Sequence, residues 1–335
     1  SEAKNIDLSR DMQIAITEYA PDSQVVANGK LWTGRYVKQV PNRELVRYHY
    51  LHCHCGYFGK VLDVKLEQSY KLKCPSCGEQ QAYSSIFVVP EFGFIAEGKP
   101  KEPGTKRPER TYACRKFFSG VGDLIESREV LLGEGRTLIT TQTHGILTVV
   151  NNGLGRGFYI CRSCGYGTCQ HKPPQKHRDV YGRECLGHFE KVSLGYNLET
   201  DIAQINCLQA LQQTRRLPGY WESLLYALIE GMSEELEIDR SDLDGTIYVD
   251  QNGQSSIILF DTVPGGAGHV KRILEKGVFE DILHCSLRLL QQCGCGGAKR
   301  DTSCYGCLRN YRNQFVHDLL RCDYGINALK LILGY

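Results

Sequence analysis

Cysteine is the residue type in this sequence whose number and spacing could support chemistry. The chain has 335 residues and 16 cysteines, most of them in close pairs. The sequence shows no secretion signal, and in such a chain close cysteine pairs favour metal binding over disulfide bonds. Thiolates at these spacings are typical ligands of tetrahedral zinc, so we expect about two to three Zn²⁺ ions as cofactors and a cytoplasmic location.

The first cluster consists of two knuckles separated by about 18 residues, Cys53-His54-Cys55-Gly56 and Cys74-Pro75-Ser76-Cys77-Gly78. The glycine after each knuckle allows a tight turn whose backbone N–H groups point at the thiolates. Two such knuckles joined by a hairpin predict a four-thiolate zinc ribbon. Redox-active thiols are the alternative, but the βαβ context typical of them is not visible here. The predicted ligands are Cys53, Cys55, Cys74 and Cys77.

The second cluster begins with a clear knuckle, Cys161-Arg162-Ser163-Cys164-Gly165. The cysteines and histidines that follow it are more numerous than a tetrahedral site can take. Cys185 is the best third ligand. For the fourth we prefer His177, and His188, at a knuckle spacing from Cys185, stays an alternative. The predicted ligands are Cys161, Cys164, His177 and Cys185.

The third cluster combines Cys293-Gly294-Cys295 with Cys304-Tyr305-Gly306-Cys307, and its glycines allow the close turns of a four-thiolate cage. The predicted ligands are Cys293, Cys295, Cys304 and Cys307. Sites with four protein ligands leave no position for a reactive water, so these metals are expected to be structural. Four of the other five cysteines are expected in the core: Cys114, Cys207, Cys285 and Cys322. The fifth, Cys169, lies among the surplus candidates for the second cluster.

A glycine-rich stretch, Val263-Pro264-Gly265-Gly266-Ala267-Gly268, joins a predicted strand to a predicted helix. It is neither a Walker loop nor a Rossmann fingerprint. Two interpretations stay open: a tight turn packed against the metal cage, or backbone amides that cradle a phosphate. We see no nucleophile–base pair and expect no catalytic residue, although Asp261, His269 and His317 are the candidates for a self-contained hydrolase.

The surrounding pattern predicts an α+β fold, in which β-rich zinc-ribbon modules precede a mixed module closed by a four-cysteine zinc cage. A helical apolar spacing covers Leu217–Glu237, and an Asn252-Gly253 turn predicts a hairpin of Thr246–Asp250 and Ser255–Asp261. Helices are also expected at Asp11–Tyr19, Tyr311–Arg321 and Asn327–Leu333, and short strands at Leu138–Thr141 and Ile146–Val150. The expected domains are residues 1–110, with a zinc ribbon and a basic loop, 111–200, with the second knuckle, and 201–335.

Charge is distributed unevenly although the net charge is only +2. Residues 98–116 carry seven Lys/Arg against two Glu, and residues 288–321 carry six against two Asp, whereas residues 222–244 carry eight acids and one Arg. Such segregation is typical of a molecule with one face toward a polyanion, although separate solvated faces would give the same counts. No apolar run reaches the ~18 residues of a membrane helix, so we expect no membrane partner.

The stretch LFDTVPGGAGHV, followed by CGC and SCYGCLRNYRNQ, resembles the MrfA-type zinc-binding (MZB) domain family. That domain occurs in the C-terminal region of bacterial superfamily-two DExH helicases and in the DrmB component of the DISARM antiphage system. Ile14–Gly34 and Ser193–Ile202 are similar to the same group. The resemblance implies zinc on Cys293, Cys295, Cys304 and Cys307. The chain departs from the family in the longer insert between Cys295 and Cys304.

No ATPase motif is present, so a helicase motor would have to lie elsewhere in the polypeptide or on a partner. The first hypothesis is a zinc-stabilised nucleic-acid-binding accessory domain of such a helicase, in DNA repair or antiphage defence, that binds single-stranded or overhang DNA. Its predicted contacts are Lys106, Arg107, Arg309, Tyr311 and Arg312, where basic and aromatic side chains alternate. In another interpretation, this segment is a helix that caps the metal cage, and Tyr311 and Phe315 pack from it into the protein core. The alternative function is a protein-interaction scaffold that docks through the acidic helix at Glu222–Asp244.

Overall fold

The computed structural model describes residues 10–63, 73–80, 85–98, 100–105, 108, 114–120, 124–133, 135–206 and 209–335. The strands are β1 (Gln24–Ala27), β2 (Lys30–Val37), β3 (Arg47–His52), β4 (Phe58–Leu62), β5 (Ser85–Val88), β6 (Phe94–Ala96), β7 (Cys114–Gly120), β8 (Leu124–Leu132), β9 (Gly135–Asn151), β10 (Phe158–Cys161), β11 (Gly167–Thr168), β12 (His177–Arg178), β13 (Glu184–Cys185), β14 (Phe189–Asn206), β15 (Leu243–Val249) and β16 (Ser255–Asp261). The α-helices are α1 (Met12–Glu18), α2 (Gln209–Gln212), α3 (Tyr220–Glu235), α4 (Val278–Gln292) and α5 (Cys322–Leu333), and the 3₁₀ helices are η3 (Gln213–Arg216), η4 (Arg240–Asp242), η5 (Val270–Leu274) and η6 (Tyr311–Val316).

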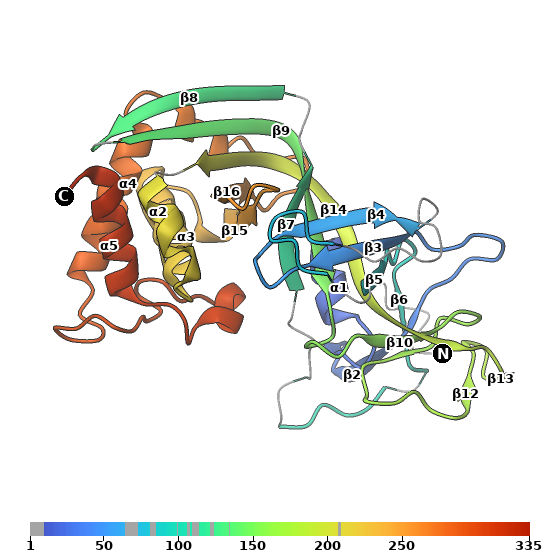
Figure 1. Ribbon diagram of the computed structural model, residues 1–335. Helices are drawn as coiled ribbons and strands as arrows, with labels where there is room; N and C mark the ends of the chain where they lie inside the picture. The colour runs from blue at the N-terminus through green and yellow to red at the C-terminus, as the bar shows by residue number, and fades with distance from the viewer. Residues whose placement is uncertain are drawn as a thin grey trace.

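Two long strands, β9 and β14, run through both halves of the molecule (Figure 1). They pair antiparallel from Leu194 opposite Asn151 to Asn206 opposite Leu138, with one irregularity between Thr200 and Ile202. β14 also pairs with β10 and β16 in antiparallel and with β5 in parallel orientation. Most of its residues are buried, and these include polar side chains such as Ser193, Thr200 and Asp201 as well as apolar ones.

The alternation of side chains along β16 assigns its two faces to two different cores. Ile257 and Leu259 belong to the core formed with the helices, whereas Ile258 and Phe260 belong to a second core with β9, β10 and α1. Successive strand residues point to opposite faces, so one apolar run serves both cores. In the first core, α3, α4 and α5 pack on one another beneath β8, β9 and β14 (Figure 1).

The strands of the zinc-ribbon module belong to the same 11-stranded sheet as β9 and β14. β3 pairs with β4 as a hairpin and with β5, and β5 joins β14. A separate small sheet has the order β1-β2-β6. The predicted α+β fold, with β-rich modules followed by a mixed module of helices and strands, is confirmed by this arrangement.

Several predicted elements differ from those observed. The predicted strands Leu138–Thr141 and Ile146–Val150 are parts of the single strand β9. The predicted helix Tyr311–Arg321 is wrong in length, because only the 3₁₀ helix η6 forms and Arg321 precedes α5. The predicted hairpin is confirmed as β15 and β16. The predicted domain boundary at residue 200 falls inside β14, and the division into three domains stays a prediction. Within the described residues, no helix is both long and apolar enough to cross a membrane.

Candidate metal centres and the basic aromatic surface

The first cluster brings together the four cysteines predicted for it. Cys53 follows the end of β3, and its Sγ lies 3.5 Å from that of Cys77. The Sγ atoms of Cys55 and Cys74 are 3.6 Å apart. Four thiolates at the corners of a zinc tetrahedron lie about 3.8 Å from one another, given Zn–S bonds of about 2.3 Å. The cluster therefore fits one zinc ion.

Local backbone turns hold these thiols in place. The N–H groups of Gly56 and Gly78 donate to the carbonyls of Cys53 and Cys74, and both glycines have positive φ. Burial would raise the pKa of the Cys55 thiol, but a hydrogen bond from the Tyr57 amide and contacts with neighbouring side chains lower it to about 6. Burial raises the pKa of Cys53 and Cys74 in the same cluster, so the thiols differ in acidity when no metal is bound.

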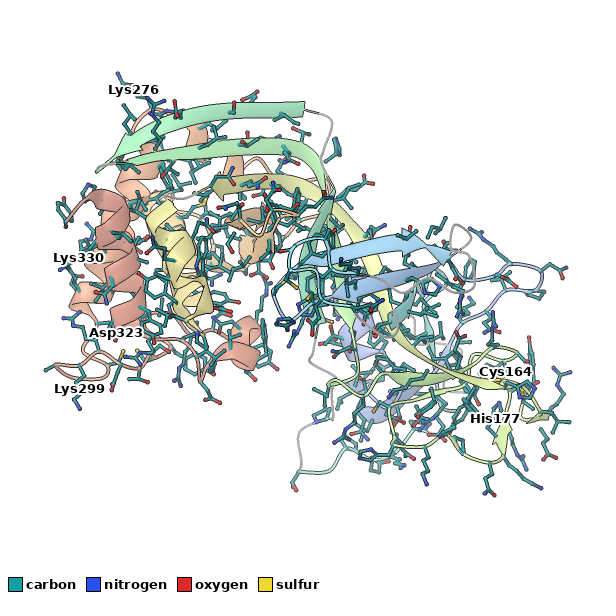
Figure 2. The ribbon with its side chains drawn as sticks, in the orientation of Figure 1. Cys164, His177, Lys276, Lys299, Asp323 and Lys330 are labelled. Atoms are coloured by element: carbon teal, nitrogen blue, oxygen red, sulfur yellow. The ribbon has the colours of Figure 1, made fainter. Side chains whose placement is uncertain are left out.

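The second cluster places Cys161, Cys164, His177 and Cys185 within 4.8 Å of one another. Cys161 ends β10, and its Sγ lies 3.8 Å from that of Cys185. His177 and Cys185 stand directly opposite each other in the β12–β13 pair. In Figure 2, Cys164 and His177 lie together at one end of the molecule. The alternative ligand His188 is exposed and lies outside this group.

Three details show that this pocket suits a metal ion. His177 Nε2 is buried and has no hydrogen-bond partner among the described residues. Burial also lowers the pKa of His177, so its ring is neutral and can donate a lone pair. A Cβ atom on Gly187 would come within 2.6 Å of Cys161 Sγ, so glycine is required where the chain passes the thiol.

The third cluster contains five sulfur atoms, one more than predicted. Cys293 Sγ lies 3.4 Å from Cys295 Sγ and 3.6 Å from Cys304 Sγ. Cys307 Sγ is 3.7 Å from both Cys295 and Cys304. Cys322, expected in the core, is indeed fully buried, but its Sγ also lies 3.4 Å from Cys307 and 3.6 Å from Cys295. Sequence reasoning missed Cys322 because residues 308–321 separate it from Cys307 and it has no neighbouring cysteine in the sequence.

The glycine loop is a turn organised by two carboxylates. The fully buried Asp261 accepts hydrogen bonds from the N–H groups of Ala267, His269 and Val270. Asp201 accepts from the N–H of Gly268 and forms an ion pair of 2.7 Å with Lys271. These donors are already satisfied by negative charge, so the phosphate cradle considered for this loop is wrong. The turn packs on β9, β14 and β16 through η5.

The segment after the third cluster presents aromatic and basic side chains to solvent. Tyr305, Tyr311 and Phe315 are 67%, 59% and 56% exposed, so the interpretation that placed Tyr311 and Phe315 in the core is wrong. Arg312 is exposed, and Arg309 is half-buried with its Nε 2.9 Å from Ser303 Oγ. We call Tyr305, Arg309, Tyr311, Arg312 and Phe315 the basic aromatic surface.

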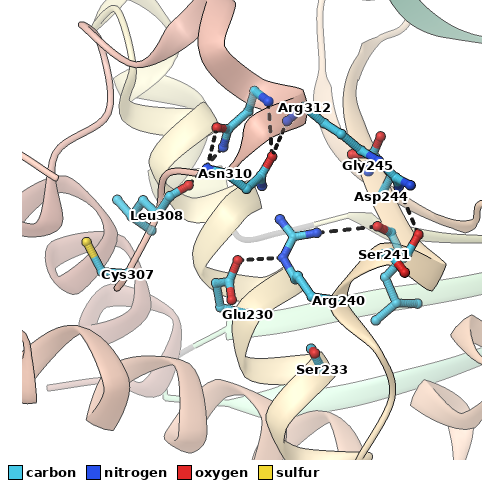
Figure 3. A network of polar contacts seen from close by, with 12 residues as sticks. Glu230, Ser233, Arg240, Ser241, Asp244, Gly245, Cys307, Leu308, Asn310 and Arg312 are labelled. Carbon is cyan, nitrogen blue, oxygen red and sulfur yellow. Dashed lines mark hydrogen bonds and ion pairs between the residues drawn. The ribbon is translucent and has the colours of Figure 1, made fainter. Parts of the chain in front are cut away.

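Polar contacts fix the backbone beneath this surface (Figure 3). The side chain of Asn310 accepts from the N–H groups of Arg312 and Asn313 and caps η6. Asn313 is fully buried and donates to the carbonyl of Leu308. Arg312 Nη1 donates to the carbonyl of Ser241, 2.8 Å away, which ties η6 to η4.

Two of the predicted nucleic-acid contacts, Lys106 and Arg107, lie outside the described residues. The acidic helix considered for docking is mostly an internal element. Glu222 is half-buried, and burial raises its pKa, while Glu230 is ion-paired with Arg240. Of the acids within α3, Glu234 and Glu235 are exposed.

Residues 224–308 match the family model of the MrfA Zn-binding domain, MZB. This match identifies residues 224–308 as similar to a zinc-binding domain of the MrfA type, and the resemblance seen in the sequence is confirmed over these residues.

Comparison with known proteins extends this relationship. The chain is similar to the Druantia protein DruE of Escherichia coli (strain UMEA 4076-1), with 24% identity over 360 residues that cover 95% of this chain and 19% of DruE. It also resembles the crystal structure of the DUF1998 helicase MrfA bound to DNA, with 16% identity and a TM-score of 0.34, over 65% of this chain and 24% of that one. A second structure, of MrfA bound to DNA and AMPPNP, gives 12% identity and a TM-score of 0.30, over 96% and 28%. The chain therefore spans less than a third of the length of these relatives.

Proposed function

We propose that this chain is a zinc-stabilised accessory domain that binds single-stranded or overhang DNA for a DExH-type helicase. The observation that carries the proposal is the basic aromatic surface, where three exposed rings and two arginines lie within residues 305–315. Guanidinium groups contact phosphates, and exposed rings provide stacking platforms for unpaired bases. Exposed aromatic side chains cost free energy in water, so a surface that keeps three of them suits a ligand with flat apolar faces.

The zinc ions have a structural role in this proposal. Each cluster would hold one Zn²⁺ with four protein ligands, which leaves no coordination position for substrate. The ligands of the first two clusters would be those predicted from the sequence. Metal binding of this kind contributes directly to folding, so the third cage would fix the segment that carries the basic aromatic surface.

The helicase part of the proposal rests on the MrfA-type domain, which runs directly into the basic aromatic surface. The named relatives are a helicase crystallised with DNA and a Druantia defence protein, and this chain spans only a part of each. A motor would act in the same polypeptide or on a partner, in antiphage defence or DNA repair. The scaffold alternative is less well supported, because much of its proposed docking helix is buried.

Binding to labelled single-stranded DNA, measured by fluorescence anisotropy at several salt concentrations, tests the proposal. We expect R309E/R312E to weaken binding and to reduce the magnitude of the log–log salt slope by about 0.7 for each phosphate that the protein no longer neutralises. K276E/K330E is the matched control, because it makes the same charge change at two exposed lysines that do not belong to the basic aromatic surface (labelled in Figure 2). Zinc content should be unchanged in both variants.

Equal weakening by both variants would show that only net charge matters, and the site assigned to DNA would be wrong. Unchanged DNA binding by R309E/R312E, together with loss of binding to a helicase partner, would replace the DNA-binding proposal by the scaffold alternative.

A further inference from the structure

The third cluster holds more thiols than one tetrahedral zinc ion can bind. Five Sγ atoms are linked by successive distances of 3.4–3.7 Å. A tetrahedral site accepts four of them and needs all four close to one another. The set whose sulfur atoms all lie within 4.8 Å of one another is Cys293, Cys295, Cys307 and Cys322.

We propose that Cys322 is a ligand of this zinc ion and that Cys304 is left as a free thiol. The inference deepens the proposed structural role of the zinc and concerns which residues carry it. It departs from the ligand set implied by the family resemblance, which includes Cys304 and ends before Cys322.

The surroundings of the two thiols differ in a way that favours this assignment. Cys322 is fully buried, whereas Cys304 is half-buried. Water cannot reach the Cys322 sulfur, which lies between those of Cys295 and Cys307. It can therefore either bind the same metal ion as they do or stay protonated and donate a hydrogen bond to one of them. Cys304 is half-buried, as Cys293 and Cys295 also are, so the assignment depends on the burial of Cys322 and on the distances between the sulfur atoms.

The backbone around Cys322 is built to hold it at the cage. Its N–H donates to the carbonyl of Thr302 at 2.9 Å, and the N–H of Asp323 donates to the carbonyl of Arg300 at 3.0 Å. Cys322 is also the first residue of α5, so the start of this helix fixes the position of its Cα atom at the cage. Two stretches of chain are thus joined at this point before any metal binds.

This assignment changes what the metal does for the basic aromatic surface. Cys307 and Cys322 stand at the two ends of residues 308–321, which carry Arg309, Tyr311, Arg312 and Phe315. With both cysteines on one zinc ion, the metal closes this segment into a loop anchored at both ends. With Cys304 in place of Cys322, the segment would be anchored to the metal at one end only.

Zinc content after dialysis against a chelator distinguishes the two ligand sets. We expect C322A to lose one zinc ion per chain and C304A to retain the parental content, with C285A, a buried cysteine outside the cluster, as the control. In the native holo-protein, iodoacetamide should modify Cys304 without release of zinc, as mapped by mass spectrometry. Loss of a zinc ion in C304A, or protection of Cys304 until a chelator is added, would overturn the assignment even if C322A fails to fold.

The zinc measurement is independent of nucleic acid, so it separates this inference from the proposed function. If C304A retains its zinc and the parent does not bind DNA, the ligand assignment stands and the DNA-binding proposal fails. If C304A loses zinc while R309E/R312E weakens DNA binding as expected, the DNA-binding proposal stands and the ligand assignment fails.

Discussion

The ammonium group of Lys116 lies 2.6 Å from the Asp244 carboxylate and joins β7 to β15. Both side chains are largely buried, and the Lys116 Nζ lies 5.2 Å from the centre of the Phe260 ring. The hydroxyl of Thr246 donates to the carbonyl of Lys116 next to the ion pair. The contact therefore ties the hairpin of the MrfA-type domain to the strand next to the zinc-ribbon module.

Removal of one partner of this buried ion pair is expected to destabilise the fold strongly. K116M leaves the Asp244 carboxylate without its cation, and such a change costs about 3–5 kcal/mol. K30M is the control, because Lys30 pairs with Glu102 at the exposed surface, where an ion pair contributes about 0–1 kcal/mol. Urea unfolding measures both. Equal free energies of unfolding for K116M and K30M would contradict the importance of the buried pair.

The same pair predicts a pH dependence of stability. Burial alone would raise the pKa of Asp244, but the charge and hydrogen bond of Lys116 lower it below its usual value. The folded state then binds fewer protons than the unfolded state. The contribution is fully present above the ordinary carboxyl pKa of about 4 and is lost as the pH falls through the lower folded pKa.

We therefore expect the stability difference between the parent and D244N to shrink as the pH is lowered from about 6 to about 3. Urea titrations of both proteins at each pH measure it, and loss of zinc in acid affects both alike. A difference that stays constant over this range would show that folding does not change the pKa of Asp244.

The second cluster predicts different results for its two candidate histidines. H177A should lose one zinc ion per chain, because His177 lies among the three cysteines with its Nε2 unpaired, and H188A should lose none. G187A should also lose this zinc ion, since the added Cβ would displace Cys161 Sγ. Elemental analysis of the purified variants gives the answer. Retention of all zinc in H177A would point to another fourth ligand.

Aromatic and basic residues of the basic aromatic surface should affect DNA binding in different ways. Y311A/F315A removes two rings and no charge, so affinity should fall by ~1–3 kcal/mol for each base that stacks, while the salt slope stays unchanged. R309E/R312E should change the slope as well. Anisotropy titrations at several salt concentrations separate the two effects. An unchanged affinity of Y311A/F315A would show that bases do not stack there.

Asp261 should matter for stability and not for DNA binding. D261A leaves three backbone N–H groups without their acceptor, and each buried orphan costs ~1–3 kcal/mol. D250A is the control, because Asp250 accepts two N–H groups in an exposed hairpin turn and its removal should cost less. Thermal unfolding and DNA titration measure the two properties. Weaker DNA binding by a folded D261A protein would reopen a ligand role for the glycine loop.

Cysteine spacing predicted the clusters well because zinc knuckles are local structures. Cys53 and Cys55 reach the metal from one turn, so a few residues contain the whole signal. Cys322 gives no such signal. It reaches the third cluster only because α5 begins beside the turn at Arg300–Thr302, which is a tertiary contact.

The missed strand and helix have similar physical causes. His144, with a φ of 55°, and Gly145 resemble a turn in the sequence, yet β9 continues through them because β14 pairs on both sides. Tyr311 and Phe315 have helical spacing, but η6 ends after six residues and leaves both rings in solvent. In both cases the neighbouring chain, and not the local pattern, decides the conformation.

The β9–β14 ladder has a consequence for the order in which the chain folds. Its partners, such as Leu138 and Asn206, are far apart in sequence, so the intervening chain must lose much of its freedom before the first pair forms. The thiols of each knuckle meet across a few residues and can capture metal early. We expect zinc uptake to precede the slow formation of the ladder during refolding, with the bound ions acting as nucleation points for a topology of high contact order.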